Sequence, residues 1–206
     1  MGVKLDAIDT VVAGRFNPHI ISPPWLAKEG IIAEGETVEA QIGVVGRAVV
    51  FRFKTGDFIW QVDYNRLVVS AEKIADTASV VAKVIEKLPH TPITAFGNNF
   101  HYSCNLSEWK GCLPRLENVG MDQLKEYGDV QSMGWKASIS QADSVTVNVE
   151  MSIEPTESPP KVSVNLNYHR QVNAAADLVT AAQRFEEDRK ASATLLESLL
   201  REKVEQ

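Results

Sequence analysis

Residues 145–153 read Val-Thr-Val-Asn-Val-Glu-Met-Ser-Ile, and residues 162–168 read Val-Ser-Val-Asn-Leu-Asn-Tyr. In both stretches an apolar side chain stands at every second position, with a polar one between. Because successive side chains of a strand point to opposite faces, each stretch predicts a strand with one buried and one exposed face. Strands of a parallel sheet covered on both faces would read as continuous apolar runs instead. We therefore expect an α+β fold with a mainly antiparallel sheet and helices on one of its faces.

A long C-terminal helix is predicted directly after these strands, from Ala174 to about Glu205, with Asn173 as its N-cap. At a rise of roughly 1.5 Å per residue it would be on the order of 45 Å long. A helix longer than its sheet, with leucines at its far end, needs another surface to bury them. That surface is either the edge of the same domain or another protein chain, and we expect the latter. The second apolar stripe of this helix consists of Leu195, Leu196, Leu199, Leu200 and Val204.

The rest of the chain predicts further strands and short helices. Gly43, Gly46 and Gly56 indicate turns, and the turn at 54–57 joins two strands of a hairpin. The other expected elements are a strand at Thr10–Phe16, a helix from Ser22 to Gly30, a helix capped by Asp76 or Thr77 and stopped by Pro89, a strand at Thr91–Cys104, a short helix at Met121–Tyr127 and a strand at Gly134–Ser140. We expect one domain over residues 1–206, built either as a unit or as two sheet-helix halves of about 1–105 and 106–206.

Charge and composition exclude several classes of partner. The formal net charge is −6, and the basic residues are scattered, so we expect no nucleic-acid partner unless folding gathers a local basic patch. No apolar run reaches the ~18 residues that span a bilayer, and the N-terminus lacks a signal-peptide pattern. These features predict a cytoplasmic protein without membrane contact. Cys104 and Cys112 are then reduced thiols, the alternative being a disulfide between them, and no zinc site is predicted.

The sequence contains none of the familiar catalytic motifs. It has no phosphate-binding glycine loop, no GxSxG elbow and no HExxH helix. The best cluster lies in the strand around residue 100, where Asn99, His101 and Ser103 share one face, and His169 lies on the polar face of the last strand. A histidine beside a hydroxyl and an amide is able to do acid–base or nucleophilic work. The favoured interpretation is an exposed polar sheet face, so we expect no catalytic residues, no cofactor and no metal.

A resemblance to a known group rests on short phrases, mostly in the first half. These are Gly14-Arg15-Phe16-Asn17-Pro18, Pro24-Trp25-Leu26, Phe51-Arg52-Phe53, and Leu88-Pro89-His90-Thr91-Pro92 with Gly97-Asn98-Asn99-Phe100. They resemble a sporadically distributed family of uncharacterised bacterial proteins. The resemblance implies an antiparallel sheet followed by a C-terminal helix, and it transfers no catalytic residues. The patchy distribution implies an accessory role, as in phage defence or mobile elements.

Two hypotheses of function follow. The first is a non-enzymatic cytoplasmic interaction protein, an oligomer or a small subunit of a larger complex, which contacts itself or another protein through the C-terminal helix. The second is a small-molecule-binding or hydrolytic domain, with a pocket between sheet and helix lined by Asn99, His101 and His169. The absence of catalytic motifs favours the first.

Overall fold

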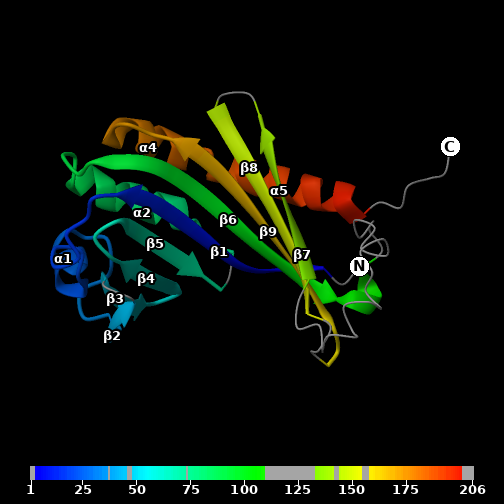
Figure 1. Cartoon of the computed structure of the whole chain (residues 1–206). Coiled ribbons are helices and arrows are strands. Elements are labelled where there is room, and N and C mark those ends of the chain that lie inside the picture. Colours follow the sequence, from blue (N-terminus) through cyan, green and yellow to red (C-terminus); the bar gives the residue numbers. More distant parts are fainter. Residues whose placement is uncertain are drawn as a thin grey trace.

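In the computed structural model, the described part of the chain forms one antiparallel sheet of nine strands with helices on one face (Figure 1). The structure describes residues 3–36, 38–45, 48–72, 74–109, 133–141, 144–154 and 158–200. This arrangement confirms the predicted α+β class, including the helical C-terminal segment.

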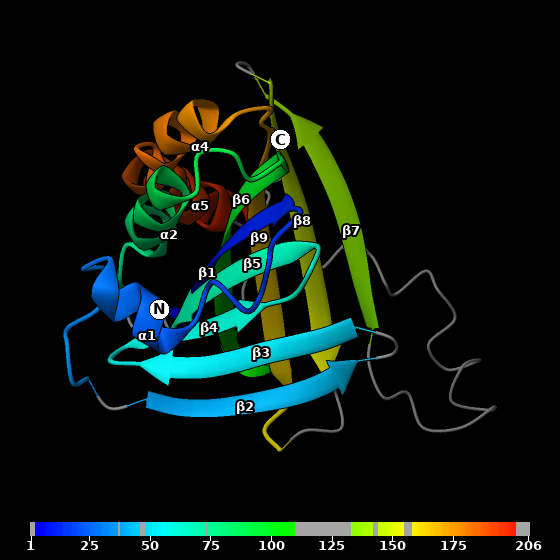
Figure 2. The same ribbon diagram turned by 90° about the vertical axis from the view of Figure 1, so that its left-hand side faces the viewer.

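The sheet order is β2-β3-β4-β5-β1-β6-β9-β8-β7, so the first strand lies in the middle. Seen in Figure 2, β2 and β3 run across the direction of β7 and β8, because the strands of a sheet twist progressively. The strands are β1 (Lys4–Gly14), β2 (Val38–Val45), β3 (Ala48–Thr55), β4 (Phe58–Val62), β5 (Arg66–Ala71), β6 (Ile93–Asn105), β7 (Met133–Ser140), β8 (Val145–Glu154) and β9 (Lys161–Gln171).

Helices α2, α4 and α5 lie together against one face of the sheet, which we call the inner face (Figure 2). The helices are α1 (Pro23–Lys28), α2 (Thr77–Lys87), α4 (Ala175–Ala182) and α5 (Phe185–Leu200), with a short 3₁₀ turn, η1, at Leu106–Glu108. No helix in the described part of the chain is both long enough and apolar enough to cross a membrane. The other face of the sheet, which we call the open face, carries the polar side chains of the alternating strands.

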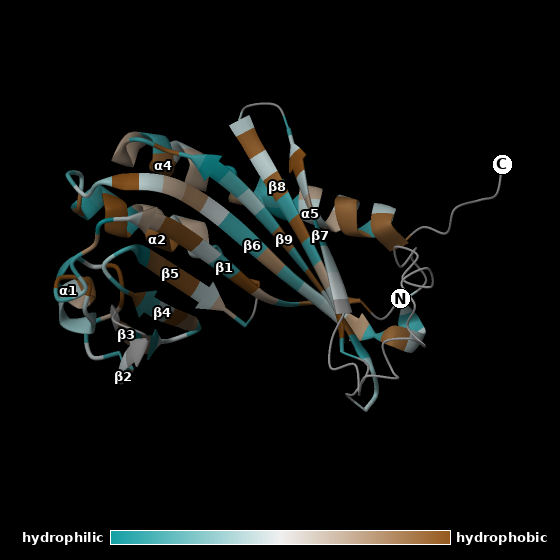
Figure 3. Ribbon diagram, in the orientation of Figure 1, coloured by the Kyte–Doolittle hydropathy of each residue, from teal (hydrophilic) through white to brown (hydrophobic). Residues whose placement is uncertain are grey.

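The alternation read from the sequence decides which side chains form the core. Figure 3 shows apolar and polar bands alternating along β6 and β8. Val147, Val149 and Met151 of β8 are buried, whereas the residues between them are partly or fully exposed. In the centre of the core, the ring of Phe100 packs against Tyr168 and Phe185 at centroid distances of 5.9 and 5.8 Å. The inner face is therefore filled by side chains from the sheet and from α5.

Several predicted boundaries are confirmed. Ser22 is the N-cap of α1, and Gly30 follows the helix with a φ of +69°. Asp76 caps α2 by accepting a hydrogen bond from the backbone N–H of Ser79 at 2.8 Å. Gly56 supplies the positive φ of the β3–β4 turn. The helix predicted at Met121–Tyr127 lies outside the described residues.

Two strand predictions need correction. β1 begins at Lys4 and ends at Gly14, whereas the expected strand ran from Thr10 to Phe16. Its early half is held by pairing with β6, from Lys4 opposite Ser103 onward, which the sequence alone does not reveal. β2 is absent from the predicted strands, because Gly43 indicates a turn in the sequence. In the structure the strand continues through Gly43.

The single long C-terminal helix is also wrong in part, since it is broken between α4 and α5. The backbone N–H of Arg184 bonds to the carbonyl of Ala181, three residues back, instead of four, and this tightens the turn. Neither glycine nor proline stands at the break, so packing rather than local sequence produces it. Ala174, not Asn173, is the N-cap, and the carboxylate of Asp177 accepts both of their backbone N–H groups.

Candidate functional site

A row of hydrogen-bonded polar side chains crosses five strands on the open face. Asp9, Asn99, Asn167, Asn148 and Ser138 stand directly opposite one another on β1, β6, β9, β8 and β7. Starting from β7, each side chain donates a hydrogen bond to the next. The Ser138 hydroxyl donates to Asn148 at 2.7 Å, and the Asn148 amide donates to Asn167 at 3.0 Å. The Asn167 amide donates to Asn99 at 2.6 Å, and the Asn99 amide donates to Asp9 at 3.4 Å. Each amide of this polar row uses one of its two N–H groups in these hydrogen bonds.

His101 and Ser103 lie beside this polar row, but each has its own carboxylate partner. The Nε2 of His101 is 2.8 Å from a carboxylate oxygen of Asp9, and the hydroxyl of Ser103 donates to Asp6. No hydrogen bond joins His101 to Ser103 among the described contacts. A serine nucleophile requires a base that takes its proton, so this pair does not form the arrangement of a hydrolase.

His169 is on the open face as predicted, but it does not meet His101. It stands opposite Gly97 on β6, whereas His101 stands opposite Asn165 on β9. Four residues of strand separate these positions, which is about 13 Å. Asn99, His101 and His169 all point away from the helices, so they do not line a space between sheet and helix.

The polar row gives a direct test of its contribution to stability. Replacing Asn167 with alanine removes two hydrogen bonds of the row, and we expect the free energy of unfolding to fall by about 1–2 kcal/mol in urea denaturation. Asn165 is a matched control, because it lies on the same face of the same strand but its side-chain oxygen has no hydrogen-bond partner in the described structure. Asn165→Ala should not lower stability, because it removes a buried oxygen that accepts no hydrogen bond from the described residues. Equal losses for the two variants would contradict a cooperative row.

A second polar network is buried between the sheet and the helices. The hydroxyls of Thr77 and Thr10 are 2.7 Å apart, and Thr10 donates to Asn98 at 3.0 Å. The amide of Asn98 donates to Asp188 at 2.9 Å, and Arg170 donates to both oxygens of Asp188 at 2.7 and 2.6 Å. Only 4% of Asp188 and 7% of Arg170 is exposed. The network joins α2 and α5 to three strands and so positions the helices, while the Nε of Arg170 has no hydrogen-bond partner in the described structure.

Cys104 is a buried free thiol among the described residues, while Cys112 lies outside them. Burial and the nearby carboxylate of Glu108 both raise the pKa of the Cys104 thiol. Because the thiolate is the reactive form, this shift disfavours Cys104 as a nucleophile. In the described ranges, no group of three or more His, Cys, Asp or Glu side chains is placed to hold a metal ion.

The leucine stripe of the C-terminal helix divides into two sets. Leu196 and Leu200 belong to the core, with 6% and 7% of their surfaces exposed. Leu195 and Leu199 are partly buried at its margin, and Val204 lies outside the described residues. The chain itself therefore buries two of the five residues of the predicted contact stripe.

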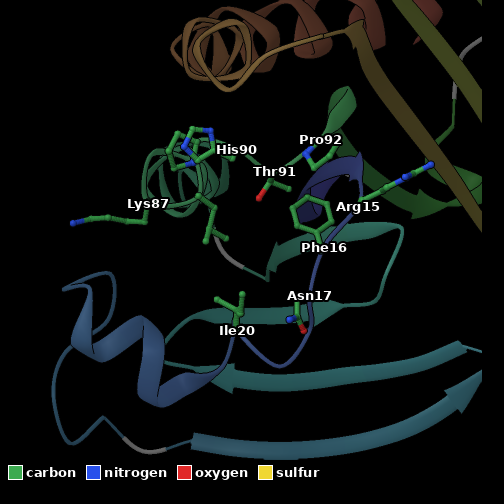
Figure 4. Close-up of a pocket in the computed structure, with 10 residues that line it drawn as sticks. Arg15, Phe16, Asn17, Ile20, Lys87, His90, Thr91 and Pro92 are labelled. Atoms are coloured by element: carbon green, nitrogen blue, oxygen red, sulfur yellow. The ribbon is translucent and has the colours of Figure 1, made fainter.

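A surface hollow of about 360 Å³ opens between two segments that are distant in sequence (Figure 4). Residues 15–17 and Ile20 follow β1, and residues 87–92 connect α2 to β6. Figure 4 shows Phe16 and Thr91 in the middle of the group, with Asn17 and Ile20 across from Lys87 and His90. The ring of Phe16 is buried, whereas Ile20 is 39% exposed. Ile20 thus gives the hollow an apolar side chain that faces solvent, beside the buried ring of Phe16.

Backbone contacts fix the shape of this hollow. The N–H of Arg15 donates to the carbonyl of Pro92 at 2.8 Å, and the N–H of Phe16 donates to that of Tyr64 at 3.0 Å. A Cβ on Gly14 would lie 2.5 Å from the Pro92 carbonyl oxygen, so only glycine permits this close approach. The two segments are therefore held together by main-chain contacts.

The rim of the hollow carries basic residues on two sides (Figure 4). Arg15, Lys87 and His90 are its titratable residues, and no acidic side chain lines it. Lys87 forms an ion pair with Glu29 at 3.4 Å, and the C-terminus of α2 adds partial negative charge nearby. Arg15 extends away on the opposite side (Figure 4), and no ion-pair partner is described for it. The unbalanced positive charge of the rim therefore comes mainly from Arg15.

Sequence reasoning did not predict this hollow, although two phrases that carry the family resemblance line it. Gly14-Arg15-Phe16-Asn17 and Leu88 to Pro92 are more than seventy residues apart, and only the pairing of β1 with β6 brings them together. Neither known family models nor curated proteins match the chain.

Proposed function

We propose that the protein is a non-enzymatic, cytoplasmic interaction protein that docks a segment of a partner protein in the hollow. The observation that carries the proposal is the exposed side chain of Ile20, which lines the hollow together with the buried ring of Phe16 and with Arg15. A partner side chain that enters the hollow would gain apolar burial, at about 25 cal/mol per Å² of surface removed from water. An accessory bacterial complex, implied by the resemblance, is the setting we propose.

The shape of the hollow favours a protein segment over a small molecule. Small-molecule sites usually bury ~70–90% of the ligand surface. This hollow opens to solvent, so it suits a single anchoring side chain whose neighbours spread over the surrounding surface. The charge of Arg15 favours an acidic residue next to that anchor. The His101 and Ser103 pairings supply no competing catalytic site.

Contact through the C-terminal helix stays a prediction within this proposal. Leu195 and Leu199 are the members of the stripe that keep exposed surface, so a contact there would use these two residues. The hollow supports the proposal better, because Ile20 in its wall is 39% exposed and is not part of the core.

The test uses a labelled short peptide with one tryptophan flanked by acidic residues, measured by fluorescence anisotropy against the full chain. We expect saturable binding that Ile20→Lys abolishes, since a charged group would then occupy the apolar wall. Arg15→Glu should weaken binding about five- to tenfold, because an exposed charge pair contributes about 0.2–1 kcal/mol and reversal turns attraction into repulsion.

The matched control is Arg52→Glu, since Arg52 is also exposed but lies on β3 away from the hollow. It should leave the affinity unchanged. A second peptide with lysines in place of the acids should prefer the Arg15→Glu variant. Equal weakening by Arg15→Glu and Arg52→Glu would indicate general charge attraction and would contradict docking at the hollow.

A further inference from the structure

The edge strand β2 has features that favour pairing with another strand. It is eight residues long and pairs with β3 from Val38 to Val45 without a bulge. It contains neither proline nor lysine, and its central residues 40–43 are uncharged. Natural edge strands are commonly protected by such charges, prolines or bulges, because unpaired backbone groups attract other strands. The opposite edge strand, β7, has Lys136 at its centre.

Ile42 adds an apolar group to this edge. It is 69% exposed, the highest value among the exposed large hydrophobic side chains of the described residues. It stands opposite Phe51 of β3 and so belongs to the inner face of the sheet. Burying Ile42 requires a neighbour on the far side of β2, because in the described structure the sheet ends there.

We propose that β2 pairs antiparallel with β2 of a second copy of this chain, about a two-fold axis at Ile42. Residues opposite each other in an antiparallel pair point to the same face of the sheet. A two-fold axis perpendicular to the sheet must therefore pair even-numbered residues with even-numbered ones and odd-numbered residues with odd-numbered ones. With the axis at Ile42, that residue meets its own copy, Gln41 faces Gly43, and Glu39 faces position 45. No like charges stand opposite each other, and the inner and open faces continue across the pair.

A second copy fits this edge for two reasons on the strand itself. The register pairs Ile42 with its own copy and Ala40 with position 44, and it places Gln41 and Glu39 opposite uncharged positions. An isologous contact therefore uses one patch twice. It also buries two exposed isoleucine side chains against each other, which together contribute a gain of apolar burial. An unrelated extended segment would need its own matching side chain at position 42.

The experiment measures the mass of the full chain by sedimentation velocity over a concentration series. We expect a monomer–dimer equilibrium that Ile42→Lys shifts at least tenfold toward monomer, because the variant places two like charges face to face. Ile74→Lys is the matched control, since Ile74 is 65% exposed but lies outside β2. It should leave the equilibrium unchanged, and circular dichroism should show both variants folded.

A second variant tests the register. Ile42→Cys should form a disulfide between copies under mild oxidation, at a rate well above that of the unmodified chain with its own two cysteines. A monomer at all concentrations, or a dimer that Ile42→Lys leaves intact, would overturn the proposal. Peptide docking in the hollow is measured separately at concentrations where the chain is monomeric, so the failure of either proposal is distinguishable from failure of the other.

Discussion

Asp188→Ala is expected to lower the free energy of unfolding by about 3–5 kcal/mol, because it leaves a buried cation without its partner. The Arg170 guanidinium is 7% exposed, and both of its described hydrogen bonds go to the Asp188 carboxylate. The variant also removes the acceptor of the Asn98 amide. Urea denaturation should show the loss directly, and the melting temperature should fall by about 10 °C for a domain of this size.

Two variants separate this effect from a general effect of helix substitution. Glu197→Ala on the exposed side of α5 should change stability by less than about 0.5 kcal/mol. The double variant Arg170→Met with Asp188→Leu should recover most of the loss, since replacing a whole buried pair by apolar residues is often neutral. If Asp188→Ala alone stayed within about 1 kcal/mol of the parent protein, the guanidinium of Arg170 would be solvated in the variant, and the prediction would be wrong.

The alternating strands could be predicted from sequence because a strand with one buried face has an apolar side chain at every second position. Val147 and Val149 of β8 are in the core as expected, and Asn148 between them is on the open face. β2 has the same alternation at Ala40, Gln41 and Ile42, but Gly43 interrupts it. Glycine within a strand weakens the local signal, and the pairing with β3 is what keeps this segment extended.

Contacts between distant residues could not be predicted. Asp188 stands in a run of charged residues, which is typical of a solvated helix face, yet it is buried against Arg170 of β9. The break at Arg184 turns α5 so that Asp188 reaches Asn98 and Arg170, and no local residue indicates that break. The hollow could not be predicted for the same reason, because its two lining segments are distant in sequence and meet only through the β1–β6 pairing.

The candidate catalytic residues illustrate a limit of face assignment. Alternation correctly places Asn99, His101 and Ser103 on one face, but it does not say which neighbour each side chain contacts. Two carboxylates of β1 supply those contacts separately: Asp9 pairs with His101, and Asp6 accepts a hydrogen bond from Ser103. A shared face is therefore a necessary condition for a catalytic group and not a sufficient one.

The leucines at the C-terminal end of α5 either pack in the core of their own chain or contact another protein. The predicted contact stripe requires these side chains to extend beyond the sheet, and deleting residues 195–206 is the simplest test of it. Leu196 and Leu200 are in the core, so that deletion would remove core packing together with any contact surface. Single substitutions separate the two effects.

Leu196→Ala is expected to lower the free energy of unfolding by about 2–5 kcal/mol, because it leaves a cavity in the core. The mass measured by light scattering should not change, because Leu196 is only 6% exposed and is therefore covered by its own chain. Leu199→Ala is the matched control, because Leu199 is only partly buried, and it should cost clearly less. If Leu196→Ala instead left stability intact and altered the mass, Leu196 would be buried by another chain rather than by its own core.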